Sequence, residues 1–229
     1  FNQIFINSED QVISEKYAEI RKFLKDKKDG DMDTRDILTI KGLIRRGEAR
    51  TACTYNNIPL ERCHFLDLPF YETGKIQKNP ISEADVEIVR NLLREVKPHQ
   101  IFVAGDLADP HGTHRVCTDA VFAAVDLEKE EGAEWLKDCR IWMYRGAWAE
   151  WEIENIEMAV PISPEELRAK RNSILKHQSQ MESAPFLGND ERLFWQRSED
   201  RNRGTATLYD QLGLASYEAM EAFVEYIPL

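Results

Sequence analysis

Two histidines stand three residues apart in the stretch GDLADPHGTHRVC, residues 105–117. An apolar run, residues 100–105, precedes them, and TDAVFAAV follows. Imidazole changes its charge near neutral pH and binds metal ions, so His111 and His114 could act as acid, base or ligand. At a helix start the two would share one face. Surface or capping roles are the competing interpretation.

Nearby carboxylates could support these histidines. Asp106 and Asp109 are close enough in the sequence to hydrogen-bond an imidazole and fix its orientation. A catalytic zinc ion requires three protein ligands and an open position, whereas two histidines supply at most two. The sequence contains no other tight cluster of His, Asp or Glu that completes the set.

The hydrophobic pattern predicts the elements that would position these groups. Helices are expected over residues 8–28, 34–55, 82–97, from 111 or 113 to 127, and 163–181. Strands are expected over 63–70, 100–105, 140–148 and 156–163, the last two as antiparallel neighbours. Residues from 182 onward read as a polar loop that ends in a short helix, 216–226.

Alternating strands and helices are typical of an α/β fold. We expect a Rossmann-like, mostly parallel sheet with helices on both faces. In such sheets ligands bind beyond the carboxyl ends of the strands. The stretch GDLADPHGTH holds that place after residues 100–105.

Composition narrows the class of protein. The 229 residues are 42% hydrophobic and carry a net charge of −11, which argues against a partner with a phosphate backbone. No apolar run approaches the roughly 18 residues of a membrane span, and the first residues do not resemble a signal peptide. Without CxxC spacing, the cysteines are expected to be reduced, buried thiols of a cytoplasmic protein: Cys53, Cys63, Cys117 and Cys139. Homo-oligomer formation stays open.

The order Asp109-Pro110-His111-Gly112-Thr113-His114 resembles the second signature of the PIG-L/LmbE-like N-acetylglucosaminyl deacetylases. That signature is typically His-Pro-Asp-His-x-x-His at a helix start. Three further segments resemble the family in the same order: IRRGEARTACTYNNI, CHFLDLPFYETG and LRAKRNSILKHQSQ. The resemblance spans residues 41–181.

This resemblance implies a zinc-dependent hydrolase that removes an acetyl group from an amino sugar. It implies that His114 binds zinc and that His111 stabilises the oxyanion or protonates the leaving amine. Arg45, or equally Arg46, and Glu72 would contact sugar hydroxyls, although Glu72 stands where the family more often has Asp. The expected set is catalytic His111, metal ligand His114, substrate-binding Arg45, Glu72 and Tyr144, and supporting Asp106 and Asp109.

Three features have two interpretations each. Tyr144, Arg145 and Trp148 could stack on a sugar or belong to the core. His177 could cap a helix or line the site. The segment 186–204 could be a lid or an interface arm.

The family's opening motif, His-Pro-Asp-Asp-Glu after a strand, has no match in residues 1–229. Zinc would therefore need ligands that are not present in this chain. We expect one deacetylase-like domain, incomplete at its N-terminal strand or strands. It would comprise a leading helical segment 1–33, a core 34–181 and a C-terminal extension 182–229.

The sequence of residues 104–117 also resembles that of bacterial proteins in which such a module follows a glucosamine-6-phosphate deaminase-like domain. Three functional hypotheses follow. The protein is a zinc-dependent deacetylase of amino-sugar metabolism, or a non-catalytic sugar-binding or regulatory module. In the third, the activity of the whole chain resides in the fused domain.

Overall fold

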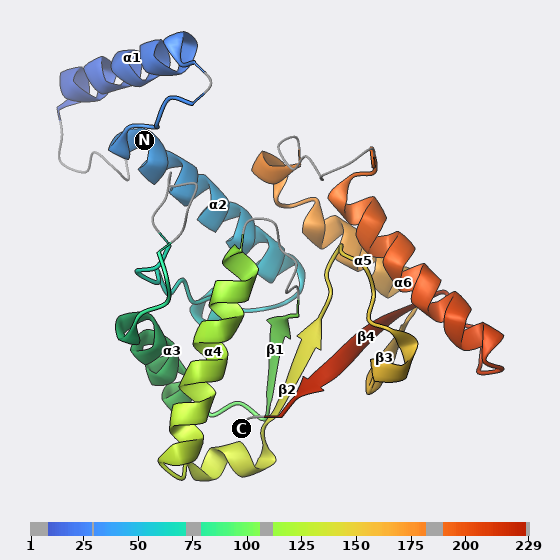
Figure 1. Cartoon of the computed structure of the whole chain (residues 1–229). Coiled ribbons are helices and arrows are strands. Elements are labelled where there is room, and N and C mark those ends of the chain that lie inside the picture. The colour runs from blue at the N-terminus through green and yellow to red at the C-terminus, as the bar shows by residue number, and fades with distance from the viewer. Residues whose placement is uncertain (1–8, 29, 72–78, 106–111, 182–189, 228–229) are drawn as a thin grey trace.

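The chain folds into six helices and a four-stranded sheet in the part that the structure describes (Figure 1). The structure is a computed structural model, and it describes residues 9–28, 30–71, 79–105, 112–181 and 190–227. The helices are α1 (Asp10–Asp26), α2 (Arg35–Tyr55), α3 (Glu83–Val96), α4 (Thr113–Glu130), α5 (Pro164–Ile174) and α6 (Phe194–Gln211). The strands are β1 (Gln100–Ala104), β2 (Arg140–Tyr144), β3 (Met158–Ile162) and β4 (Ala219–Tyr226).

The sheet has the strand order β1-β2-β4-β3. Strands β1 and β2 run parallel, with Phe102 opposite Trp142. Strand β4 runs antiparallel to both of its neighbours, β2 and β3. The α/β class is thus confirmed, and the sheet is mixed. Strands β2 and β3 are not direct neighbours, because β4 lies between them.

The place of β4 corrects the prediction of a short helix over residues 216–226. Alanine, glutamate and methionine favour helices in isolation, which is why the segment reads as helical. In the folded chain both edges of β4 are occupied by other strands, and Ala219 and Ala222 are fully buried. Pairing on two sides outweighs local propensity.

Helix α6 corrects the prediction of a polar loop after residue 182. Its sequence lacks an apolar stripe, because many of its inward-facing side chains are polar. Arg201 and Asn202 are buried and hydrogen-bond to Glu221 of β4. Because this helix packs through ion pairs, its sequence shows no hydrophobic periodicity from which a helix could be predicted.

Residues 63–70, expected as a strand, are irregular in the structure. Asp67 adopts a left-handed conformation with φ of 50°, and Pro69 follows it. The Phe70 N–H donates to the Asp85 side chain on α3 rather than to a strand (2.8 Å). The apolar run over residues 63–70 therefore does not form a strand, and its backbone is not hydrogen-bonded within the sheet.

The remaining helix starts agree with the sequence. Thr34 caps α2 by accepting the Ile37 N–H, and Ser163 with Glu166 forms a capping box at α5. Ser82 with Asp85 does the same at α3.

The main core lies between the helix pair α3–α4 and the strands β1 and β2 (Figure 1). Its fully or nearly fully buried members are Val86, Val89, Leu93, Val103, Ala120, Ala124, Val125 and Ile141. Helices α5 and α6 pack at the other end, against β3 and β4. The parallel pair β1–β2 thus belongs to the main core.

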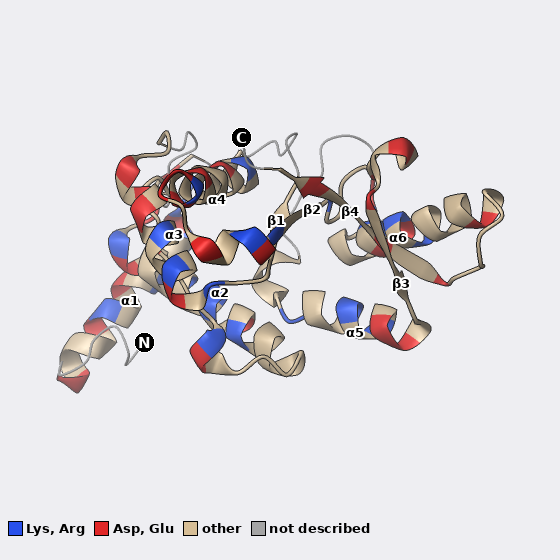
Figure 2. Cartoon of the chain, turned by 90° about the horizontal axis from the view of Figure 1, so that it is seen from below, with Lys and Arg blue, Asp and Glu red and all other residues tan. Residues whose placement is uncertain are grey.

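Basic and acidic residues are interspersed along the same helices, as Figure 2 shows for α3, α4 and α5. Among the described residues, no helix is both long and apolar enough to cross a membrane. Cys117, expected to be buried, is exposed near the start of α4.

Candidate functional site

The carboxyl ends of β1 and β2 meet at one edge of the sheet. The strands are in parallel register up to Ala104 opposite Tyr144, and the Gly105 N–H continues the ladder by donating to the Tyr144 carbonyl (2.7 Å). The Thr118 hydroxyl of α4 donates to the Ala104 carbonyl at 2.8 Å. This edge is where an α/β fold binds ligands.

Helix α4 begins beside this edge. Gly112 precedes it in a left-handed conformation with φ of 66°, which glycine adopts without strain. His114 is the second residue of the helix and is exposed. The structure thus places the predicted metal ligand at the carboxyl edge of the sheet.

Four members of the predicted set lie outside the described residues: Asp106, Asp109, His111 and Glu72. Their roles remain predictions. In sequence, His111 directly precedes Gly112, and Glu72 directly follows Tyr71.

Gly105 is held between β2 and an aromatic ring. A methyl group at this position would lie 2.5 Å from the ring of Trp151 and 3.0 Å from Met143 Cβ. Arg145 donates to the Gly105 carbonyl (3.2 Å) and lies 4.7 Å from the Trp151 ring. Close packing, more than a sharp turn, explains the glycine here.

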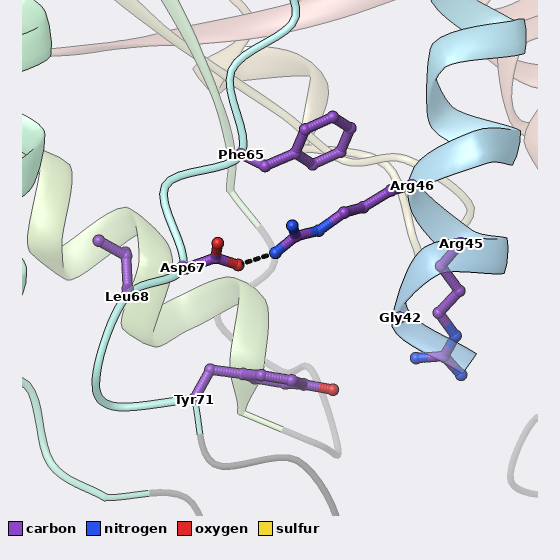
Figure 3. A pocket seen from close by; sticks show the side chains of 7 residues that line it. All are labelled: Gly42, Arg45, Arg46, Phe65, Asp67, Leu68 and Tyr71. Atoms are coloured by element: carbon purple, nitrogen blue, oxygen red, sulfur yellow. Dashed lines mark hydrogen bonds and ion pairs between the residues drawn. The ribbon is translucent and has the colours of Figure 1, made fainter. Parts of the chain in front are cut away.

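A cavity of about 320 Å³ lies between α2 and the irregular segment 63–71 (Figure 3). This volume is at the lower end of the roughly 300–1,000 Å³ typical of small-molecule sites. It is lined by Gly42, Arg45, Arg46, Phe65, Asp67, Leu68 and Tyr71.

The two arginines of the cavity have different surroundings. Arg46 donates to the carboxylate of Asp67 and its guanidinium lies 5.4 Å from the Phe65 ring. Figure 3 shows Arg45 pointing away from that pair, with the Tyr71 hydroxyl directed toward α2 across the cavity. The described lining residues thus carry two guanidinium groups and one carboxylate, and this net positive charge suits ligands rich in electronegative oxygen.

The wall that carries Tyr71 is anchored by a buried carboxylate. Asp85 is fully buried and accepts the N–H groups of Phe70 and Ser82, each at 2.8 Å. Burial by itself would raise the pKa of Asp85, but hydrogen bonds from Ser82 and Phe70 bring the pKa below its ordinary value. Asp85 is therefore ionised at neutral pH and fixes the end of the segment 63–71.

Two of the segments that carry the family resemblance meet in the structure. Glu48 of α2, in the pattern Arg45-x-x-Glu48, accepts the N–H and hydroxyl of Ser179 at 2.7 and 2.6 Å. Ser179 lies in the short helical turn Gln178–Gln180 that follows α5. Glu48 thus joins the late helical segment to the helix that carries the arginines.

Other predicted residues lie apart from this cavity. Tyr144 is exposed at the end of β2 and is not among the residues that line the cavity. His177 is half-buried at the start of the turn Gln178–Gln180. Trp148 lies 5.8 Å from the guanidinium of Arg197.

The described residues do not fit a zinc site. No group of three or more His, Cys, Asp or Glu in the ranges that the structure describes could hold a metal ion. His114, the predicted metal ligand, is among the described residues, and one ligand does not hold a catalytic zinc ion. We therefore assign no chemical step to a metal.

Sequence reasoning missed Phe65, Asp67 and Tyr71 as parts of a site. Reading residues 63–70 as a strand assigned Phe65 and Asp67 to a sheet and left Tyr71 just beyond its end. The pattern Asp-x-Pro at 67–69 was the available signal, because both residues favour irregular backbone and turns.

Part of the chain is similar to a known protein family. Residues 24–125 match the family model PIG-L, described as GlcNAc-PI de-N-acetylase. A glucosamine-6-phosphate deaminase-like protein of Bacteroides thetaiotaomicron is 96% identical over all 229 residues. The chain spans 34% of that relative's length.

Two solved structures share the fold. The conserved protein TT1542 from Thermus thermophilus matches with a TM-score of 0.53 and 18% identity, over 87% of this chain and 77% of that one. The 4-carboxy-2-hydroxymuconate hydratase GalB from Pseudomonas putida matches with a TM-score of 0.58 and 13% identity, over 93% and 79%. At these identities the likeness concerns the fold alone.

The cavity between α2 and the segment 63–71, and the start of α4, lie within the matched residues. The resemblance noted in the sequence is confirmed over residues 24–125, the part of the chain that matches the PIG-L family model.

Proposed function

We propose that this chain forms the sugar-binding part of an N-deacetylase of the PIG-L type that acts on an N-acetylated amino sugar. The observation that carries the proposal is the cavity of Figure 3, which places two arginines, a carboxylate and two aromatic rings together inside the family region.

The chemistry of the cavity suits a sugar. The Arg45 guanidinium offers several N–H donors to hydroxyl or acetamide oxygens. The rings of Phe65 and Tyr71 provide apolar surface for the C–H face of a pyranose. The Arg46–Asp67 pair supplies a further polar wall.

The proposed reaction is amide hydrolysis. Water adds its oxygen to the acetyl carbon, the C–N bond breaks, and the nitrogen leaves with a proton as the free amine. His111 as the proton donor and His114 as a zinc ligand are part of the proposal. Zinc itself would need further ligands, since the described residues provide no group of three.

A second candidate function rests on the same finding. A module without its own metal site could bind an amino sugar without hydrolysing it. The relative of which this chain spans 34% is named glucosamine-6-phosphate deaminase-like, which favours a sugar-binding or regulatory module attached to an enzyme of amino-sugar metabolism.

An assay of the longer protein separates the two candidates. Acetate release from N-acetylglucosamine and its 6-phosphate would be measured together with zinc content. The deacetylase proposal predicts acetate release that falls, along with zinc occupancy, in His114→Ala but not in His99→Ala. Sugar binding without acetate release would favour the non-catalytic module, and unchanged zinc in His114→Ala would refute that ligand assignment.

A further inference from the structure

Two thiols face each other at the C-terminal end of α2. The Sγ atoms of Cys53 and Cys63 lie 3.6 Å apart, and both side chains are half-buried. The other two cysteines belong to different elements. Cys117 lies on α4, and Cys139 immediately precedes β2.

A tight turn of the backbone holds the two thiols together. Asn57 takes a left-handed conformation with φ of 59°, and the Ile58 N–H donates to the Cys53 carbonyl at 2.9 Å. The Cys63 N–H closes the following helical turn by donating to the Leu60 carbonyl at 3.0 Å. The sulfur atoms are therefore brought together by local structure rather than by a chance approach of side chains.

We propose that Cys53 and Cys63 are a reversible oxidation site that forms an intramolecular disulfide. A disulfide has an S–S distance of about 2.05 Å, so the sulfur atoms must approach by roughly 1.5 Å, which side-chain rotation and a small backbone shift provide. The site is independent of the proposed deacetylase function.

The chemistry balances with a peroxide as the oxidant. One thiolate attacks hydrogen peroxide, so that a sulfenic acid forms and water is released. The second sulfur then attacks the sulfenic sulfur, and the S–S bond forms as a second water leaves. Two thiols and one peroxide thus yield one disulfide and two waters, and a dithiol reductant reverses the change.

The cross-link would act on the wall of the cavity. Phe65 follows Cys63 by two residues and lies 5.3 Å from the Arg50 guanidinium, next to Arg46 and Asp67. A disulfide would fasten this wall covalently to α2.

The thiol environment also predicts how the rate depends on pH. Burial, with a smaller contribution from Cys63, raises the pKa of Cys53. Because the thiolate is the reacting form, this burial should slow attack by Cys53 near neutral pH, and the attack should accelerate as the solution becomes alkaline.

The test uses this chain with Cys117→Ser and Cys139→Ser, so that the proposed pair supplies the only two thiols. After treatment with hydrogen peroxide, the intact mass should fall by about 2 Da, because two hydrogens are lost, and no thiol should remain for alkylation. Dithiothreitol should restore both. The same treatment of Cys53→Ser or Cys63→Ser should add about 16 or 32 Da instead.

Three results would overturn the proposal: two thiols that stay alkylatable, direct oxidation of both sulfurs to sulfinic acids, or a disulfide-linked dimer. Peptide mapping of the oxidised wild-type chain supplies a second measurement that does not depend on the folding of any variant. It should find the Cys53–Cys63 linkage, and a linkage to Cys117 or Cys139 in its place would contradict the inference.

Discussion

Arg45 and Arg46 are adjacent in the sequence, yet the structure separates their roles. Successive residues of an α-helix project about 100° apart, so the two side chains leave α2 in different directions. Arg46 turns to Asp67, whereas Arg45 points into the rest of the cavity (Figure 3). The sequence left open which arginine would meet a ligand, and this geometry favours Arg45.

Asp85 is expected to control the stability of the cavity wall. Asp85→Ala removes a buried acceptor and leaves the Phe70 N–H unsatisfied, so the free energy of unfolding should fall by about 3 kcal/mol. Glu87→Ala is the control on the same helix, because Glu87 is exposed and its ion pair with Arg90 is long, at 3.5 Å. It should change stability by less than about 0.5 kcal/mol. Urea unfolding of both variants measures the difference.

The effect of Asp85 should depend on pH. Its pKa in the folded chain lies below the unfolded value of about 3.9, so its contribution is present above that pH and is lost as the pH falls through the folded pKa. The gap between wild type and Asp85→Ala should therefore be full at pH 7 and shrink on acidification below about pH 4. A gap that widens in acid would contradict this assignment.

Gly105 should tolerate no added methyl group. Gly105→Ala would force the Trp151 ring away from its contact with Arg145, and we expect a loss of about 1–3 kcal/mol. Gly204→Ala, in the middle of α6 with open space around the new methyl group, should instead stabilise the chain by about 0.5–1 kcal/mol. Thermal unfolding of the pair decides the matter, and equal effects would refute the packing argument.

At the scale of elements, the sequence predicts best where local signals and the fold agree. The starts of α2, α3 and α5 follow from capping residues, and β1 follows from its continuous apolar run. Strand β4 could not be predicted, because its partner strands β2 and β3 lie far away in the sequence. Helix α6 could not be predicted, because most of its buried side chains are polar. The carboxyl edge of the sheet could be predicted from the sequence. The cavity could not, because one of its walls is an irregular segment whose sequence predicted a strand.

The contact between α6 and β4 depends on buried charges. Arg201 bonds to Glu150 at 2.6 Å, to Glu221 and to the Gly146 carbonyl, and its side chain is 4% exposed. Burial by itself would raise the pKa of Glu221, but Arg201 and Lys170 bring the pKa below its ordinary value. Removing Arg201 would take its guanidinium away from both carboxylates, so that Glu150 loses this ion pair and Glu221 keeps the one with Lys170.

Arg201→Ala should therefore lower the free energy of unfolding by about 3–5 kcal/mol. Arg203→Ala is the matched control two residues away, because its ion pair with Glu218 is exposed and contributes less than about 1 kcal/mol. Chemical denaturation measures both. Similar losses in the two variants would show that the buried network does not stabilise this contact.

At the scale of the whole molecule, the candidate site combines groups from separate parts of the chain. The cavity is built from residues 42–71, and His114 stands at the sheet edge beyond β1. The chain spans 34% of the length of its relative, so the activity of the longer protein is part of the proposal. The expected single domain with boundaries at 33 and 181 stays a prediction. Strand β4 places residues beyond 181 inside the sheet.

The most direct test of the central claim is the affinity of this chain for an amino sugar. Isothermal titration of N-acetylglucosamine would compare wild type with Arg45→Ala and with Arg35→Ala. Arg35 is an exposed arginine on the same helix that does not line the cavity.

We predict one binding site whose affinity falls about tenfold or more in Arg45→Ala, since a hydrogen bond from a charged group contributes about 1.5–3 kcal/mol. Arg35→Ala should bind like wild type. Wild-type binding that Arg45→Ala leaves unchanged, or no binding by the wild-type chain, would contradict the proposed sugar site.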